Sequence, residues 1–410
     1  MSTTSTTTSN TADPAAPTDP APVRSPLVGW LAVVTVMMGI FAIVTTEILP
    51  IGVLTAVGAS FRISDGVAGL MMTMPGVLAA IAAPTVTVAT ARLDRRLMLC
   101  LLMLVLTLAN ILAAVATAYW VMMISRVLVG FVIGAFWSIG AGLGARLVRP
   151  ERAGLATAVI FSAVPLGSVL GVPAGTLIGN IADWRAAFVA LAIVSAAVFV
   201  SLIVFVPPLP PVRVTRLSVL RGMLRSTAVR VGLAATFLIV LAHFGTYTYV
   251  TPFLETVTGI APGGITVCLL IYGAAGVAGN FVAGALVSRN LRVVFGASAC
   301  LLAGATLLLP VLGRSVPGAV VLLVVWGTAY GAVPVCSQSW FAASAPHAPE
   351  AATVVFTASF QATIAVGALV GGVVVDATSP SVVMVLGGTV AILMVATVCL
   401  ADVDGTVRAR

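Results

Sequence analysis

Apolar runs long enough to cross a lipid bilayer follow one another along almost the whole chain, separated by short polar links. A bilayer core about 30 Å thick needs roughly 20 apolar residues in a helix that rises about 1.5 Å per residue. Uninterrupted runs of this length favour helices over barrel strands, because barrel strands alternate apolar and polar residues. The pattern therefore predicts an all-α polytopic membrane protein.

The breaks between the runs define twelve predicted spans, near 28–51, 66–90, 97–117, 119–146, 153–179, 184–206, 231–252, 264–288, 293–313, 316–340, 350–375 and 380–401. The longest interior link, which is rich in proline and arginine, separates six spans from six. We therefore expect a disordered tail rich in Ser, Thr, Ala and Pro at 1–27 and a first six-helix bundle at 28–206. A cytoplasmic link at 207–230, a second six-helix bundle at 231–402 and a short cytoplasmic tail at 403–410 follow.

Arginine predicts the orientation of the chain in the membrane. The sequence is 60% hydrophobic and 8% charged, carries a net charge of +8, and contains no lysine. With the N-terminus inside, sixteen arginines lie in cytoplasmic links and only Arg62, Arg185 and Arg314 lie outside. Because positive charge marks the cytoplasmic side, both termini are predicted to be cytoplasmic, in the inner membrane. Scattered basic residues of this kind do not indicate nucleic-acid binding.

Several chemistries are not expected. The five cysteines lie inside apolar runs without CxxC spacing, and the second histidine, His347, falls in a predicted loop, so neither a disulfide framework nor a metal site is predicted. The sequence has no nucleotide-binding motif, no recognisable catalytic cluster and no soluble signalling domain. A transporter without a cofactor, driven by an ion gradient or by the substrate's own gradient and predicted to be a monomer, fits better than an enzyme or a sensor.

The two halves of the sequence echo each other. The fifth span ends in Gly175-Thr-Leu-Ile-Gly179 followed by Asp183, and the eleventh ends in Gly367-Ala-Leu-Val-Gly371 followed by Asp376. Such internal symmetry is expected of transporters in which two bundles rock around a central site.

Five short segments carry a family resemblance: TTEILPIG (45–52), ISDGVAG (63–69), GAFWS (134–138), WRAAF (184–188) and WG (326–327). They resemble bacterial sugar efflux and purine ribonucleoside efflux transporters, in the drug and metabolite:proton antiporter branch of the major facilitator superfamily. The resemblance implies twelve helices in two pseudo-symmetric six-helix bundles. It also implies proton-coupled transport of a small molecule by alternating access.

Two further motifs resemble functional elements of that superfamily. Asp94, Arg95 and Arg96 are similar to its gate motif between the second and third helices, where the acid locks the cytoplasmic gate. The alternative is a solvated charged turn. The fifth span carries a glycine stripe similar to the antiporter motif, with plain helix packing as the alternative, at Gly167, Gly171, Pro173 and Gly175.

Glu47 and Arg126 are predicted to lie at similar depth inside the membrane. Glu47 follows Trp30 by roughly 25 Å of helix, in the outer part of the first span, and Arg126 lies roughly 9 Å below Trp120. In the resembled fold both line the central cavity. Burial favours a protonated carboxyl and a nearby arginine favours an ionised one, so Glu47 is a candidate proton carrier tuned by Arg126. A static structural pair, or a hydrated Glu47, is the alternative.

His243 is a second candidate for proton coupling, with substrate contact or packing as the alternative. Flat side chains with hydrogen-bonding tips suit a neutral, ring-bearing ligand such as a sugar or nucleoside. The predicted substrate cavity contains Phe136, Trp137, Tyr247, Tyr272, Trp326, Tyr330, Gln338 and Gln361. The sequence thus predicts proton-coupled efflux of a small, largely neutral compound, with proton-coupled uptake as the alternative.

The predicted topology can be tested by labelling. A cysteine placed in the link 207–230 of a chain without other reactive cysteines should react with a membrane-impermeant maleimide only after the cytoplasmic face is made accessible. Labelling from outside intact cells would contradict the predicted orientation.

Overall fold

The computed structural model describes residues 26–89, 93–139, 143–210, 225–344 and 349–400. Most of the two predicted tails, part of the link 207–230 and His347 lie outside these ranges. Within them, the regular structure is helical. The first half contains α1 (Pro26–Gly52), α2 (Leu54–Phe61), α3 (Asp65–Ala68), α4 (Leu70–Ala89), α5 (Arg95–Ala114), α6 (Tyr119–Ile139), α7 (Leu143–Leu147), the 3₁₀ turn η1 (Pro150–Arg152), α8 (Ala153–Phe161), α9 (Ala163–Ile181) and α10 (Trp184–Phe205).

The second half contains α12 (Thr227–Tyr247), α13 (Val250–Thr256), α14 (Pro262–Leu312), α15 (Val316–Ser344), α16 (Pro349–Ala377) and α17 (Pro380–Leu400). Eleven helical segments of the described chain are long and apolar enough to cross a membrane. The sequence predicts twelve, and the difference lies in α14, whose 51 residues cover the predicted spans 264–288 and 293–313. These run into each other through Asn290, whose backbone (φ −157°, ψ 87°) is not helical.

Two predicted spans are each covered by two helices in the structure. The predicted fourth span reaches 146; α6 covers it up to Ile139 and α7 covers its end, while residues 140–142 lie outside the described ranges. The predicted fifth span is continuous from 153, whereas the structure divides it into α8 and α9 at Ser162.

The third span, α5, shows how the helices divide lipid from core. Its exposed residues Leu101, Leu104, Leu108 and Ile111 recur at intervals of three and four, so they form one face of the helix. The buried residues, which include Met103 and Leu106, lie on the other face. An apolar face turned outward is typical of a helix that is solvated by lipid.

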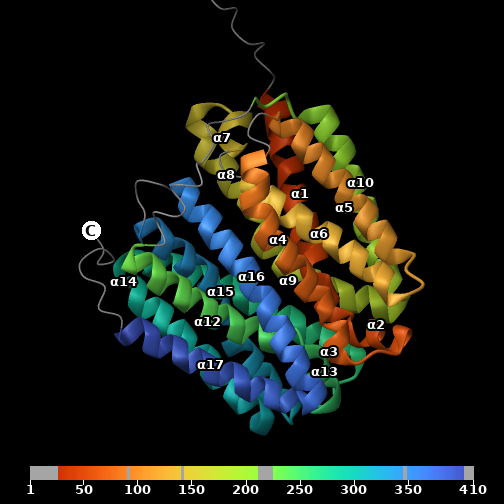
Figure 1. The fold of residues 1–410 in the computed structure, drawn as a ribbon, viewed down its shortest axis with the longest axis vertical. Helices are drawn as coiled ribbons and strands as arrows, with labels where there is room; N and C mark the ends of the chain where they lie inside the picture. Colours follow the sequence, from red (N-terminus) through yellow and green to blue (C-terminus); the bar gives the residue numbers. More distant parts are fainter. Residues whose placement is uncertain (1–25, 90–92, 140–142, 211–224, 345–348, 401–410) are drawn as a thin grey trace, which may run out of the picture.

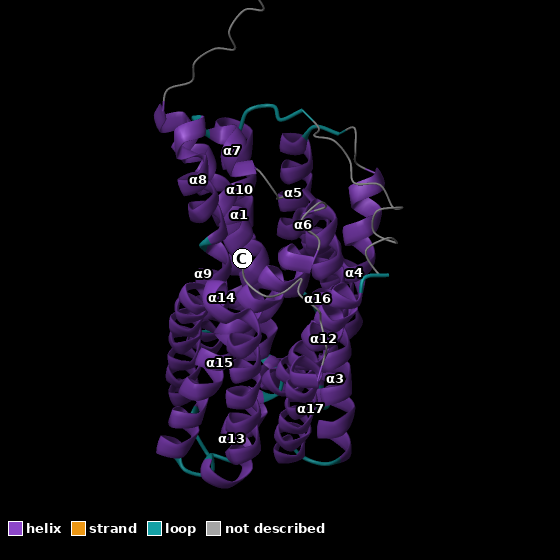
Figure 2. Cartoon of the chain, turned by 90° about the vertical axis from the view of Figure 1, so that its left-hand side faces the viewer, coloured by secondary structure: helices purple, strands orange, loops and turns teal. Residues whose placement is uncertain are grey.

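The helices form two bundles, one from each half of the chain, with the first half in red to yellow-green and the second in green to blue (Figure 1). They run lengthwise with their loops gathered at two ends (Figure 2). Within the first bundle α1 packs on α9, α4 on α6 and α5 on α10; within the second, α12 packs between α16 and α17. The bundles meet along α4–α16 and α9–α14. We call the end that carries α2, α3 and α13 the outer end, following the arginine asymmetry.

Glycines bring the bundles into backbone contact at both meeting lines. A Cβ added at Gly76 on α4 would lie 2.7 Å from the Gln361 carbonyl oxygen on α16, and one added at Gly273 on α14 would lie 2.9 Å from the Val169 Cα on α9. Small residues of this kind are the usual means by which membrane helices approach closely. The two contacts are related by the pseudo-symmetry that the sequence echo predicts.

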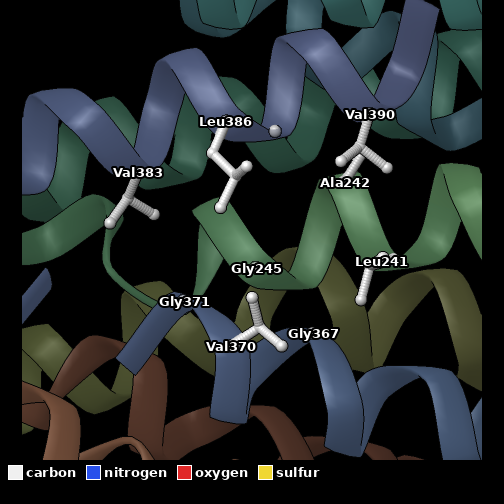
Figure 3. A pocket seen from close by; sticks show the side chains of 10 residues that line it. Leu241, Ala242, Gly245, Gly367, Val370, Gly371, Val383, Leu386 and Val390 are labelled. Atoms are coloured by element: carbon white, nitrogen blue, oxygen red, sulfur yellow. The ribbon is translucent and has the colours of Figure 1, made fainter. Parts of the chain in front are cut away.

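The second bundle contains a small apolar pocket between α12, α16 and α17 (Figure 3). Gly245 of α12 faces Gly367 and Gly371 of α16, and a Cβ at Gly367 would lie 3.1 Å from the Gly245 backbone nitrogen. The lining is almost entirely apolar, with Leu241, Val370, Leu386 and Val390 among its members. We therefore regard this pocket as a feature of helix packing.

The predicted antiporter motif on α9 packs against α1. Added Cβ atoms at Gly167, Gly171 and Gly175 would lie 3.0 to 3.1 Å from side-chain atoms of Val44, Ile48 and Leu49. The stripe therefore sets the distance between α9 and the part of α1 that carries Glu47, which supports the packing alternative for these residues.

We expect Gly171→Val to destabilise the protein by about 1–3 kcal/mol, because the added methyl groups would press on Ile48 and on the α1 backbone. Gly154→Val is the matched control, since no heavy atom lies within 4 Å of a Cβ at Gly154. The yield of monodisperse protein after heating in detergent would measure the difference. Equal heat resistance of the two variants would contradict the packing role.

Candidate functional site

Glu47 joins the two bundles near the middle of the protein. Its side chain is 9% exposed, and it is the one acidic residue buried within the described ranges. The Gln361 Nε2 group on α16 donates a hydrogen bond of 2.8 Å to Glu47 Oε1. Gln361 is itself 5% exposed. The sequence predicts Glu47 as a proton carrier and Gln361 as a cavity residue, and the structure brings the two into contact.

Arg126 lies at the depth predicted for it but does not form an ion pair with Glu47. It is fully buried on α6, and its Nη1 group donates a 3.0 Å hydrogen bond to the backbone carbonyl of Thr46, next to Glu47. Its guanidinium carbon lies 5.2 Å from the ring centre of Phe188, which comes from the WRAAF segment. Direct tuning of Glu47 by Arg126 is thus replaced by a contact through the α1 backbone. Arg126 holds the turn of α1 that carries the acid.

Asn110 on α5 is a site residue that the sequence analysis missed. It is fully buried, and its Nδ2 group donates a 3.2 Å hydrogen bond to Thr46 Oγ1. Thr46 therefore accepts one bond on its side chain from Asn110 and one on its backbone from Arg126. An asparagine in the middle of an apolar span is the signal that would have found it, because an unpaired amide in lipid is costly.

An aromatic cluster formed by His243, Tyr247, Tyr272, Trp326 and Tyr330 fills the centre of the second bundle. His243 stacks on Tyr330 and on Tyr247, with ring centres 3.3 and 5.0 Å apart, and Tyr247 stacks on Tyr272 at 4.6 Å. Trp326 meets the histidine edge to face. These five predicted cavity and coupling residues are therefore one physical unit.

The hydrogen bonds of this cluster define its chemistry. Trp326 Nε1 donates to His243 Nδ1 at 3.2 Å, so that ring nitrogen acts as an acceptor and carries no proton. This arrangement favours a role of His243 in ligand contact or packing over a role as proton carrier. The Tyr272 hydroxyl is buried and has no hydrogen-bond partner among the described residues. A buried hydroxyl in that condition is a natural contact for a polar ligand group.

Other residues of the predicted cavity lie apart from this cluster. Phe136 and Trp137 belong to α6 in the first bundle, where Trp137 stacks on Phe161 with ring centres 6.2 Å apart. Phe136 is buried in the core of that bundle. Gln338 is an exposed residue of α15. The eight predicted cavity residues therefore do not form one cluster in this structure, and their joint role in a substrate cavity stays a prediction.

The predicted gate motif acts locally in this structure. Asp94 caps the N-terminus of α5, accepting hydrogen bonds from the backbone nitrogens of Arg96 and Leu97 at 2.8 and 3.2 Å. The Arg95 backbone nitrogen donates to Leu209, and the Arg96 side chain donates to Ile203. These contacts tie the start of α5 to the end of α10 within the first bundle. The gate function of the motif stays a prediction.

Hydrogen bonds between described residues of the two bundles lie from the level of Glu47 to the outer end. The donor and acceptor pairs are Gln361–Glu47, Thr251–Ile51, Thr55–Glu255, Thr266–Thr176, Ser64–Asp376 and Gly66–Asp376. A cavity of about 270 Å³ lies among them, lined by residues that include Thr55, Thr176, Thr251 and Glu255. The bundles are thus joined at their outer end.

The chain matches a known family of membrane proteins over most of its length. The family model of the Major Facilitator Superfamily matches residues 29–357. The chain belongs to the Major Facilitator Superfamily. It is accordingly a membrane transporter and not an enzyme, and its helices place it among multi-pass membrane proteins.

Solved structures of transporters share the fold. A POT family transporter in complex with 5-aminolevulinic acid aligns with a TM-score of 0.74 at 13% identity, covering 93% of this chain and 97% of that one. A bacterial homologue of the human lysosomal transporter Spinster, inward-facing and unoccupied, gives 0.70 at 14% identity, with 92% and 96% covered. The human organic anion transporter MFSD10 (TETRAN) gives 0.65 at 17% identity, with 92% and 100% covered. At these identities the likeness concerns the fold alone.

We expect His243→Phe to lower the stability of the second bundle by about 1–3 kcal/mol, because the phenyl ring keeps the stacking but leaves Trp326 Nε1 without an acceptor. Adding Trp326→Phe removes the orphaned donor, so the double variant should be less destabilised than the sum of the two single changes. Thermal unfolding of the four proteins in detergent measures this coupling. Additive effects would contradict the hydrogen bond.

Proposed function

We propose that this transporter is a proton-coupled exporter of the inner membrane and that Glu47 carries the proton. The observation that supports this most is the hydrogen bond from Gln361 to Glu47, which places the buried acid at the junction of the two bundles. A buried ionisable group between moving bodies changes its surroundings whenever they move.

The proton cycle follows from the partners of the carboxyl. With the bundles joined at the outer end, an amide N–H donates to Glu47 Oε1, and a donor of this kind stabilises an ionised carboxylate. When the bundles separate at that end, the donor on α16 moves away from the acid on α1. Glu47 then takes a proton from the outer side and releases it after the outer end closes again. Inward flow of protons by this route can drive a substrate outward.

The substrate site of this proposal lies between Glu47 and the aromatic cluster. The cluster offers the ring of Tyr330, the one of the five rings that is half-buried rather than buried. The Tyr272 hydroxyl, which has no hydrogen-bond partner among the described residues, offers a polar contact. Stacking faces with a few polar tips suit a small ring-bearing compound that is largely neutral, such as a nucleoside, a sugar or a drug. The names of the aligned transporters show that the fold accepts other substrate classes, so the assignment depends on these side chains.

Glu47→Gln should abolish uphill transport while sparing substrate binding, because glutamine keeps the hydrogen bond to Gln361 but cannot titrate. The measurement is substrate accumulation in everted vesicles with an imposed pH gradient, using labelled nucleosides, sugars and dyes as probes. Accumulation driven by the gradient should fall at least tenfold, while exchange down a concentration gradient persists.

Glu255→Gln serves as the control, because Glu255 also bonds across the bundles but lies half-buried at the outer end. It should accumulate substrate normally. Unchanged uphill transport by Glu47→Gln would assign the proton to another group. Accumulation only in right-side-out vesicles would favour proton-coupled uptake over export.

A further inference from the structure

Asp376 reaches across the outer end from one bundle to the other. It stands at the C-terminal end of α16, and its carboxylate accepts a 2.6 Å hydrogen bond from Ser64 Oγ and a 2.9 Å hydrogen bond from the Gly66 backbone nitrogen. Ser64 and Gly66 belong to the first bundle and lie in the ISDGVAG segment, to which neither the proton site nor the substrate site gives a role.

The two donors belong to the first turn of the second membrane span. α3 begins at Asp65 and continues into α4 through Gly69, whose backbone is helical (φ −60°, ψ −17°). The first backbone N–H groups of a helix have no partner within the helix. Ser64 satisfies one of them by accepting from the Val67 nitrogen at 3.2 Å, and Asp376 satisfies the Gly66 nitrogen from the opposite bundle. The capping of this helix is therefore shared between the two bundles.

The backbone at Gly66 is fitted to this contact. A Cβ at this position would overlap the Asp376 carboxylate and the Gly372 carbonyl oxygen, so a larger residue would separate α3 from α16. Tyr249 also contacts both sides at this end of the molecule. Its hydroxyl donates to the Ala368 carbonyl of α16 at 2.7 Å and lies against Gly69 of the first bundle.

The pseudo-symmetric counterpart of Asp376 behaves differently. Asp183 follows the matching glycine pair of α9, yet it bonds within its own bundle. It accepts from the Arg185 backbone nitrogen and forms an ion pair of 3.4 Å with the Arg185 side chain. The sequence echo is therefore preserved while the contact has changed, and of the two aspartates the one that joins the bundles is Asp376.

We propose that Asp376, with Ser64 and Gly66, forms the latch that holds the outer end of the transporter closed. Alternating access requires the outer end to open in each cycle, so each cycle must break both hydrogen bonds. Asp65, which stands between the two donors in the sequence, is a second acid close to Asp376, and no ion pair to Asp376, from Arg62 or any other group, is present among the described residues. The carboxylate therefore stabilises the closed state through the helix N-terminus rather than through an arginine.

The test measures the closed fraction directly. Spin labels on cysteines at the exposed positions Ser60 and Thr378, one at the outer end of each bundle, report the separation by pulsed electron resonance of the purified protein. The native cysteines are replaced beforehand. Asp376→Asn removes the charge, and Gly66→Ala separates the partners while Asp376 stays intact. Each should raise the ratio of open to closed outer ends roughly 2- to 30-fold, the range that loss of a helix cap produces.

Asp183→Asn is the matched control and should leave the distance distribution unchanged. If Asp376→Asn and Gly66→Ala both give the distribution of Asp183→Asn, the latch does not exist. Ser64→Ala provides a third variant if either fails to give monodisperse protein, with the same expected direction and the same contrary outcome. The measurement uses neither substrate nor a proton gradient, so its result is independent of the role proposed for Glu47.

Discussion

A carboxyl group buried between two apolar bundles needs a polar partner, because an unpaired acid in a low-dielectric interior is costly in free energy. In this protein the partner of Glu47 is an amide on the other bundle, at 2.8 Å. The position of α1 relative to α16 and the electrostatic state of the acid are therefore linked. Arg126 and Asn110 serve the same arrangement from the side, since both hold Thr46, the neighbouring residue of α1.

Glycines allow the close helix contacts around the hydrogen bond between Gln361 and Glu47. Gly171 and Gly175 set α1 against α9, and Gly76 and Gly273 set the bundles against each other. Close backbone contact supplies van der Waals energy where lipid provides no hydrophobic drive between helices. The polar bonds between the bundles gather at Glu47 and beyond it toward the outer end. In the proposed transport cycle, two bundles joined at one end form a two-state element, because packed interfaces switch between discrete arrangements.

Much of the fold follows from the sequence because apolar length and helix breaks have direct physical meaning in a membrane. The helical class and the superfamily are confirmed, while the antiporter branch and the number of twelve helices stay predictions. The sequence also predicts that the stretch covered by α14 contains two spans, and the non-helical residue Asn290 lies between them. In the site, depth along a helix predicted that Glu47 and Arg126 lie at one level. It could not show which way their side chains point, and only the structure shows that they form no ion pair with each other.

Residues far apart in the sequence were the hardest to assign. The five rings of the aromatic cluster come from α12, α14 and α15, and the pairing of Gln361 with Glu47 joins α16 to α1. The residue types predicted the tyrosines, Trp326 and Gln361 as cavity residues, and they predicted Phe136, Trp137 and Gln338 equally, although Phe136 and Trp137 lie in the first bundle and Gln338 is exposed. The capping by Asp376 was also invisible, because its sequence context matches that of Asp183, which bonds locally.

The central claim is that Glu47 gains and loses a proton inside the folded transporter. Infrared difference spectroscopy of the purified protein, recorded between alkaline and acidic buffer, observes this event through the C=O stretch of protonated carboxyl groups. The account predicts a carboxyl band that appears on acidification of the wild-type protein, is lost in Glu47→Gln and is retained in Glu255→Gln. A difference spectrum of Glu47→Gln identical to that of the wild type would contradict it.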